Sequence, residues 1–332
     1  QYANTIRQEK TQPIGIALRL LPELLYGQGH AYARPLSGTG TEQSIADISR
    51  DDLETWHNTW FRPGNATLIV AGDTDIDEIA PRIEALFEGW APGAVPDRPV
   101  AEAALPEGEV IYLVDRPQAQ QSIIFGSQLI VPMASPGEEA IRAMNDVLGG
   151  QFSARINMNL REDKGWSYGA RSLISETRAQ RPFIAYASVQ SDRTADSLAE
   201  MRREIREIRN KRPPEAAELK RVQRSRTLSL PGRWETNRAL LSAESRIVSY
   251  GLPDDYWNDY AGRINNLTLE QVKTAAVATL DPERLTWVVI GDRALVEPSL
   301  RELGVAEIRF LDADGRLLEQ PAQPAGTGAA GR

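Results

Sequence analysis

One stretch of this sequence recurs 219 residues further along the chain. Residues 48–73 (ISRDDLETWHNTWFRPGNATLIVAGD) align without a gap with residues 267–292 (LTLEQVKTAAVATLDPERLTWVVIGD). Each copy is typical of a helix, a turn at the proline, a buried strand and then Gly-Asp. A sequence that repeats at a long period folds into related structural units. The identical positions are, in the first copy, Thr55, Pro63, Thr67, Val70, Gly72 and Asp73.

Two further matches support the repeat. Ser49 and Thr268 stand at the same place before the helix, where each is expected to act as its N-cap. Upstream, Tyr26-Gly27 recurs as Tyr250-Gly251 at an offset of 224, which implies one five-residue change of length. Helix-turn-strand segments are common, so a chance match is the alternative. A flanking match of this kind argues against it, and we expect two homologous domains.

The offset predicts how the 332 residues are divided. Two complete copies need about 440 residues, so we expect the first copy to lack its N-terminal part. The predicted regions are 1–90, the C-terminal part of a first, non-catalytic domain; 91–107, a Pro/Ala-rich linker; 108–315, a second, complete domain; and 316–332, a disordered tail. Strands, helices, strands, helices and a closing strand follow one another in the second domain. This order predicts an α+β fold, each domain a largely antiparallel sheet with helices packed on one face.

Composition excludes several classes of function. Lys and Arg number 38 against 46 Asp and Glu, and this net charge of −8 argues against a nucleic-acid partner. The absence of cysteine excludes disulfides, thiolate zinc sites and thiol nucleophiles. The two histidines, His30 and His57, form no H-x-x-x-H or H-x-x-E-H pair, so we expect no metal site in this chain. No apolar run approaches the roughly 20 residues of a membrane span.

The densest group of candidate site residues lies in residues 148–169. Arg161 is expected at a helix end and Tyr168 on the next strand, across a turn at Gly165. A guanidinium and a phenol so placed can both donate to one extended peptide, Arg161 to backbone carbonyls and Tyr168 to a developing oxyanion. The alternative is structural: a helix end at the glycines, Arg161 paired with a surface carboxylate and Tyr168 half-buried. Spacing alone favours the structural alternative.

Three segments carry a family resemblance: 148–168 (LGGQFSARINMNLREDKGWSY), 26–44 (YGQGHAYARPLSGTGTEQS) and 60–73 (WFRPGNATLIVAGD). With the repeat, they make the chain similar to the insulinase/pitrilysin-type zinc metallopeptidases, the inverted H-x-x-E-H class that includes the mitochondrial processing peptidases. The pattern L-R-E-x-x-G-x-x-Y is its most specific part. The resemblance implies that two such domains form one half of a clamshell, and that two halves enclose a peptide.

The resemblance also assigns roles to residues. Arg161 and Tyr168 match the arginine and tyrosine that the C-terminal half of such enzymes directs at substrate bound to zinc in the opposite half. Gly149, Gly150 and Phe152 are the expected substrate-binding residues beside them. This sequence departs from the family because it has no H-x-x-E-H, and the glutamate expected as third ligand falls at Thr5. The carboxylate of Glu9 is one helical turn away from that position. The resemblance therefore places zinc in a partner half and none in this chain.

The leading hypothesis is that the chain is the C-terminal half, or the non-zinc subunit, of an insulinase-type zinc metalloendopeptidase. It would bind extended peptide at a sheet edge and supply Arg161 and Tyr168 to the zinc-bearing partner half. The alternative is a catalytically silent scaffold, as some members of this family are in respiratory complexes. A third hypothesis is an enzyme with a zinc site of unfamiliar composition. We expect the chain to be inactive alone, and the resemblance favours the bacterial periplasm over the cytoplasm.

Overall fold

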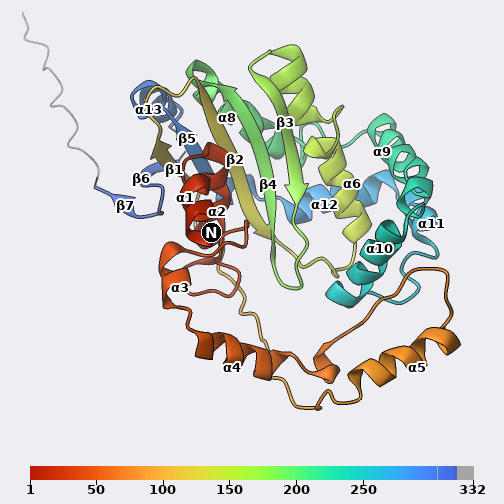
Figure 1. The fold of residues 1–332 in the computed structure, drawn as a ribbon. Coiled ribbons are helices and arrows are strands. Elements are labelled where there is room, and N and C mark those ends of the chain that lie inside the picture. The colour runs from red at the N-terminus through yellow and green to blue at the C-terminus, as the bar shows by residue number, and fades with distance from the viewer. Residues whose placement is uncertain (305, 320–332) are drawn as a thin grey trace, which may run out of the picture.

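The centre of the molecule is a seven-stranded sheet (Figure 1). The computed structural model describes residues 1–304 and 306–319. In sheet order the strands are β3 (Ser167–Ile174), β4 (Arg181–Gln190), β2 (Gln121–Ile130), β5 (Thr286–Gly291), β1 (Val110–Asp115), β6 (Glu307–Leu311) and β7 (Leu317–Leu318). Strand β1 runs parallel to β5 and β6, and the other neighbours are antiparallel. The predicted α+β class with a largely antiparallel sheet is confirmed.

Helices of the second copy pack on one face of this sheet. Their apolar sides share a core with the strand residues Leu113, Phe183 and Trp287, all of them fully buried. Strand β5 is buried at every position, and its apolar residues 287–290 alternate between the two faces, so both faces need cover. The helices after β1 are α6 (Glu138–Asn145), α7 (Arg155–Asn157), α8 (Thr194–Glu207), α9 (Ala216–Leu228), α10 (Asn237–Tyr250), α11 (Tyr260–Asn265), α12 (Leu269–Thr279) and α13 (Arg293–Glu302).

The opposite face of the sheet is covered by a helix from the first copy. Helix α2 (Pro13–Tyr26) packs Leu21 and Leu25 into a second core with Val288 and Ile290 of β5. The sequence analysis expected helices on one face only, with residues 1–90 forming a separate domain. The structure instead uses residues 13–26 to complete the core of the second domain, because the strands at the centre of its sheet are apolar on both sides.

The repeat recurs in the structure with matching bounds. Helix α4 (Arg50–Trp60) and helix α12 lie 219 residues apart at both ends, as do the short 3-10 helices η1 (Pro63–Asn65) and η6 (Pro282–Arg284). Helices α2 and α10 match in the same way at an offset of 224. Ser49 and Thr268 are the N-caps of α4 and α12, each in a capping box with the residue three positions later. The predicted caps are confirmed.

The strand predicted for the first copy does not form. Residues 66–72 contain neither helix nor strand, and Leu68 and Val70 are exposed. Its counterpart β5 is held by hydrogen bonds to β1 and β2, whereas none of the described strands lies beside residues 66–72. A single extended segment without a neighbouring strand leaves its backbone groups unpaired. The other helices of the first copy are α1 (Tyr2–Glu9), α3 (Glu42–Asp47) and α5 (Ile76–Phe87).

The predicted linker and tail differ in outcome. Residues 91–107 contain neither helix nor strand. The predicted disordered tail, 316–332, is wrong at its start, because Leu317 and Leu318 form β7 and pair with β6. The turn at Gly315, which has a φ of 85°, returns the chain onto that strand. The rest of the predicted tail, from residue 320, lies outside the described residues.

Candidate functional site

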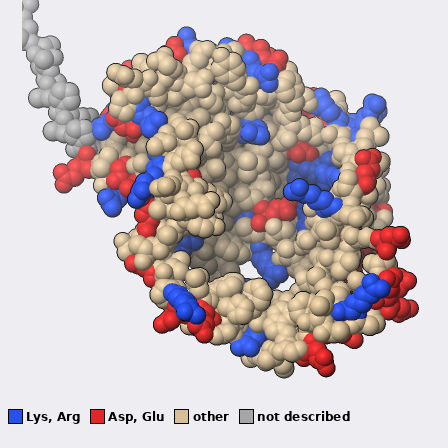
Figure 2. Space-filling model, viewed as in Figure 1, with Lys and Arg blue, Asp and Glu red and all other residues tan. Residues whose placement is uncertain are grey.

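The five predicted site residues line one open pocket of about 480 Å³. Gly149, Gly150 and Phe152 form one wall, and Arg161 and Tyr168 form another. The pocket lies at the β3 end of the sheet. Figure 2 shows that the molecule is also hollowed between the sheet and the segment that carries α4 and α5. The structure therefore brings together the residues that the sequence analysis selected.

A bulge in β3 turns Tyr168 outward. The pairing of β3 with β4 shifts between Ser167 and Gly169, so that Tyr168 is the extra residue. The Ser167 hydroxyl holds the bulge, because its Oγ donates to Ser188 O at 2.6 Å and accepts from the Gly169 N–H at 3.1 Å. Tyr168 is 84% exposed, so the structural alternative of a half-buried tyrosine is wrong.

Arg161 lies on a π-helical turn, η3 (Met158–Asp163), that ends at the turn of Gly165. Its Nε is 3.3 Å from Glu162 Oε1, as the structural alternative expected of a surface ion pair. Its Cζ also lies 5.0 Å from the ring centroid of Phe152, a cation-π contact. Arg161 is thus held against residues 149–152, which we call the glycine loop, and keeps donors available to a ligand.

The glycine loop is packed tightly against β3. A Cβ on Gly149 would meet the backbone N of Ser172 at 2.4 Å, so only glycine fits at this position. The Ser172 hydroxyl donates to Asn145 Oδ1 at 2.8 Å. The loop begins in a second π-helical turn, η2 (Asp146–Gly150), directly after α6. This close approach places Gly150 and Phe152 beside the strand that carries Tyr168.

Asn157 joins the loop to the strand. Its Nδ2 donates to Phe152 O at 2.7 Å, and its Oδ1 accepts from the Ala170 N–H at 3.2 Å. The outer edge of β3 is therefore occupied at Ala170 by a side-chain amide and at Ser172 by the glycine loop. A peptide cannot add to β3 as a strand at these two positions. The sequence analysis expected a peptide to add to a sheet edge, and β3 does not offer a free edge at Ala170 and Ser172.

Sequence reasoning missed two side chains of the pocket, Arg171 and Tyr186. They face each other in the β3-β4 register, and Arg171 Cζ lies 5.7 Å from the ring centroid of Tyr186. Burial raises the pKa of Tyr186, and the nearby guanidinium partly opposes that shift. The pairing of the two strands would have revealed this contact, but the sequence alone does not give the register.

The histidines and acidic residues of the described ranges form no metal site. Across residues 1–304 and 306–319, His, Asp and Glu side chains do not gather in groups of three that could hold a metal ion. His30 Nε2 donates to Ala101 O at 2.9 Å, and its Nδ1 accepts from the Tyr32 N–H. His57 stacks on Phe61 with 4.9 Å between ring centroids. Within the same ranges, none of the helices is long and apolar enough to cross a membrane.

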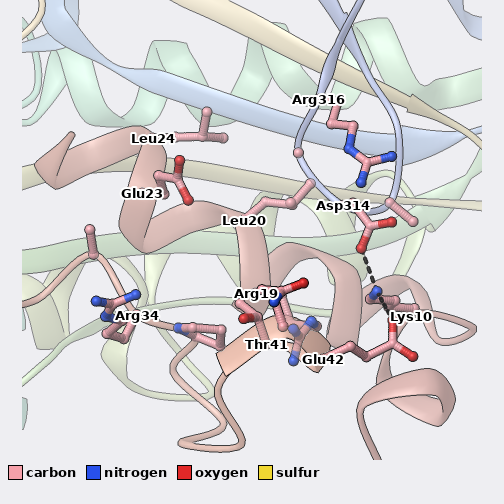
Figure 3. A pocket seen from close by; sticks show the side chains of 15 residues that line it. Lys10, Arg19, Leu20, Glu23, Leu24, Arg34, Thr41, Glu42, Asp314 and Arg316 are labelled. Carbon is pink, nitrogen blue, oxygen red and sulfur yellow. Dashed lines mark hydrogen bonds and ion pairs between the residues drawn. The ribbon is translucent and has the colours of Figure 1, made fainter. Parts of the chain in front are cut away.

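A second, polar pocket of about 370 Å³ lies between the first copy and the turn at residues 313–316 (Figure 3). Lys10 forms ion pairs with Asp314 and, at 2.7 Å, with Glu42. Glu9 pairs with Arg19 at 2.7 Å, and although burial alone would raise the pKa of Glu9, hydrogen bonds from Arg19 and two hydroxyls hold it below its ordinary value. These charges hold α1, α2 and α3 together, so Glu9 has a structural role.

The sequence of this chain matches a known protein family. The family model described as "Peptidase M16 inactive domain" matches residues 47–226, more than half of the chain. The chain belongs to the peptidase M16 family. This result confirms the resemblance to the insulinase-type peptidases. The matched domain is the family's inactive one, as expected from a sequence without H-x-x-E-H.

Three relatives illustrate the family membership. The "Non-peptidase homolog YmxG" of Helicobacter pylori is 22% identical over 87% of this chain and 68% of its own length. The "Uncharacterized zinc protease YmxG" of Bacillus subtilis is 27% identical over 51% of this chain. The crystal structure of a peptidase M16 inactive domain from Pseudomonas fluorescens superposes with a TM-score of 0.79 at 25% identity, covering 88% of this chain and 68% of that one. The chain spans only 40% of the Bacillus relative's length.

Proposed function

We propose that this chain is a non-peptidase M16 unit that binds extended peptide in the pocket of Arg161 and Tyr168. The observation that carries the proposal is the gathering of Gly149, Gly150, Phe152, Arg161 and Tyr168 in one open pocket. The family match to an inactive domain and the name of the Helicobacter pylori relative both favour a unit without peptidase activity. Binding would then be its function.

The chemistry of the pocket suits a peptide backbone. Arg161 engages Glu162 through Nε, which leaves the two Nη groups to donate to peptide carbonyls. The Tyr168 hydroxyl is exposed and can donate in the same direction. Phe152 supplies an apolar wall for a side chain. Because the β3 edge is occupied at Ala170, the peptide would be held by side chains instead of strand pairing at that position.

The test is equilibrium binding of a fluorescein-labelled, extended 12-residue peptide, followed by anisotropy. Arg161→Ala should weaken binding about tenfold, as expected when a charge-assisted hydrogen bond is lost, and Tyr168→Phe about threefold. Arg309→Ala, which replaces a half-buried arginine on β6 at the other end of the sheet, is the matched control and should bind as wild type does. Equal affinity of wild type and the three variants for the peptide, or no binding by any of them, would leave the scaffold role as the better account.

A second candidate function is supply of Arg161 and Tyr168 to the active site of a zinc-bearing M16 half. The exposure of Tyr168 on its bulge favours it, because a phenol turned toward open space can reach substrate held by another unit. The test mixes the chain with a zinc-bearing M16 half and compares wild type with Tyr168→Phe. A fall of about tenfold or more in kcat supports donation to an oxyanion. An unchanged kcat removes Tyr168 from the reaction.

A further inference from the structure

The polar pocket shown in Figure 3 is lined by charged side chains of two kinds. Some are engaged with one another: Lys10 forms ion pairs with Glu42 and Asp314. Three others have no hydrogen bond or ion pair to any side chain or backbone group of residues 1–304 and 306–319, and these are Arg34, Arg316 and Glu23. The pocket therefore holds two guanidinium groups and one carboxylate that are free to meet a ligand.

The turn that carries Arg316 is fixed in place. Asp312 Oδ1 accepts from the backbone N–H groups of Asp314 and Arg316, at 2.8 and 2.9 Å. The ion pair from Asp314 to Lys10 ties this turn to the end of α1. Gly315 packs so closely on α2 that a Cβ there would lie 3.0 Å from the side chain of Leu20. The structure thus brings the backbone of a distant segment to the rim of the pocket.

The other two free charges come from α2 and the segment after it. Glu23 lies on α2 and is exposed. Arg34 is exposed as well, but its neighbours Ala33 and Pro35 are buried, which anchors the backbone on both sides of it. Figure 3 shows Arg34 and Arg316 on two sides of the pocket, with Glu23 between them in this view. The three charges come from separate segments and line one space of about 370 Å³.

We propose that this pocket binds a small molecule with two carboxylates and one ammonium group. A free acidic amino acid and a short acidic peptide both have this chemistry. Arg34 and Arg316 would each donate to one carboxylate, because the paired donors of a guanidinium match the two oxygens of a carboxylate. Glu23 would accept from the ammonium group. The volume of the pocket is within the range of about 300 to 1,000 Å³ that is usual for small-ligand sites.

The carboxylate of Glu23 argues against a simple anion as the ligand. Phosphate, or a dicarboxylate without an ammonium group, would place like charge beside Glu23, and that repulsion opposes the attraction of the two arginines. An ammonium group on the ligand turns the same carboxylate into a partner. The expected selectivity for a zwitterion therefore depends on one residue, and it can be tested by neutralising that residue.

This site is separate from the pocket of Arg161 and Tyr168. Arg316 directly precedes β7, which lies at the opposite end of the sheet from β3. None of the residues that line one pocket lines the other. Loss of a charge in the polar pocket should therefore leave peptide binding at Arg161 unchanged.

Isothermal titration calorimetry of the chain tests the proposal with two ligands, L-glutamate and the dipeptide L-aspartyl-L-alanine. At least one of them should bind saturably, and the tighter of the two identifies the source as free amino acid or peptide. Each is compared with a molecule that lacks the ammonium charge, glutarate and N-acetyl-L-aspartyl-L-alanine. Each comparison molecule should bind at least about fivefold more weakly than its charged counterpart, because it cannot pair with Glu23.

Three variants test the assigned contacts, and all replace exposed side chains, so folding should be unaffected. Arg34→Gln and Arg316→Gln should each weaken binding of the tighter ligand about tenfold. Glu23→Gln should weaken it about fivefold and leave the affinity for the molecule without ammonium unchanged or higher. Arg238→Gln, at an exposed arginine on α10, is the matched control and should bind as wild type does.

Three results would overturn the proposal. One is the absence of saturable binding by both L-glutamate and the dipeptide. Another is equal affinity for the ligands with and without an ammonium group, since Glu23 would then have no part in recognition. The third is binding by Arg34→Gln and Arg316→Gln that equals binding by Arg238→Gln, which would place the ligand at some other site.

Discussion

The guanidinium of Arg161 lies over the ring of Phe152, with Cζ 5.0 Å from the ring centroid. The two residues come from different elements, a π-helical turn and the glycine loop, so this contact joins both walls of the candidate pocket. A cation-π contact at an exposed site contributes about 0.5 to 1 kcal/mol. That is enough to bias the orientation of an arginine that also pairs with the exposed Glu162.

Removal of the ring should weaken peptide binding without unfolding the chain. For Phe152→Ala we predict a loss of affinity of about two- to fivefold, since the cation-π contact and an apolar wall are both lost. The melting temperature should change by less than about 2 °C, because Phe152 is 63% exposed. Peptide anisotropy and differential scanning calorimetry check the two quantities. Phe152→Trp keeps a ring, and weaker binding by this variant than by Phe152→Ala would contradict the assigned role.

Asn157 should stabilise the fold through its two hydrogen bonds. Asn157→Ala leaves the Phe152 carbonyl and the Ala170 N–H without their partner, and we expect the free energy of unfolding to fall by about 1 to 3 kcal/mol. Urea unfolding followed by circular dichroism measures this change. Asn258→Ala is the matched control, at an exposed position, and should leave the urea midpoint within error. Equal midpoints for the two variants would show that the Asn157 bridge is not formed.

Two glycines of the pocket should differ in how well they tolerate replacement by alanine. Gly149→Ala forces a Cβ against the Ser172 backbone and should destabilise the chain by about 1 to 3 kcal/mol. Gly169→Ala lies in the same pocket, where a Cβ meets no atom within 4 Å, and should cost less than about 1 kcal/mol. Thermal unfolding of both variants checks the contrast. A Gly169→Ala chain that melts below Gly149→Ala would contradict the close packing of loop and strand.

The ion pair between Arg155 and Glu218 should make stability depend on acid pH. Burial alone would raise the pKa of Glu218, but hydrogen bonds from Arg155 and a backbone N–H outweigh it and hold the pKa below the usual 4.5. A carboxyl group with a lowered pKa in the folded state supplies stability that is complete above pH 4.5 and is lost as the pH falls through the folded value. Glu218→Gln should therefore be less stable than wild type by about 1 to 3 kcal/mol at pH 7.

The difference between wild type and Glu218→Gln should shrink as the pH is lowered below 4.5. Urea midpoints at pH 7 and at pH 3 measure it. Glu235→Gln, an exposed position outside the described ion pairs, is the control and should follow wild type at both values. A difference that grows toward pH 3 would contradict the assigned sign.

Metal content separates a non-peptidase unit from an enzyme with an unfamiliar zinc site. The described residues offer no group of three His, Asp or Glu side chains for a metal. The purified chain should hold well below one zinc per molecule by plasma mass spectrometry, and EDTA should leave its melting temperature unchanged. Stoichiometric zinc that EDTA removes with loss of stability would contradict this account.

Local signals in the sequence predicted much of the first copy and of the site. Ser49 and Thr268 were found as caps because a cap depends only on the next few residues. Arg161 and Tyr168 were placed correctly because they are close in sequence and a single turn, at Gly165, separates their elements. The family resemblance, and not the spacing, is the ground on which a functional role is expected for them.

Long-range relationships could not be predicted in the same way. The pattern of residues 66–72 predicts a strand. A strand forms only beside another strand, and the sequence pattern does not show whether a neighbouring strand is present. The position of α2 on the second face of the sheet depends on how two distant segments dock. The contact of Arg171 with Tyr186 depends on the register of β3 with β4.

The most direct test of the central claim is to locate the bound peptide by hydrogen exchange. The chain is measured with and without a saturating concentration of the same unlabelled extended peptide. We predict slower exchange at residues 149–152 and 167–171, and unchanged exchange in the groove of about 920 Å³ between α6 and α12. Slower exchange confined to that groove, or no change at residues 149–152 and 167–171, would contradict peptide binding at the Arg161 and Tyr168 pocket.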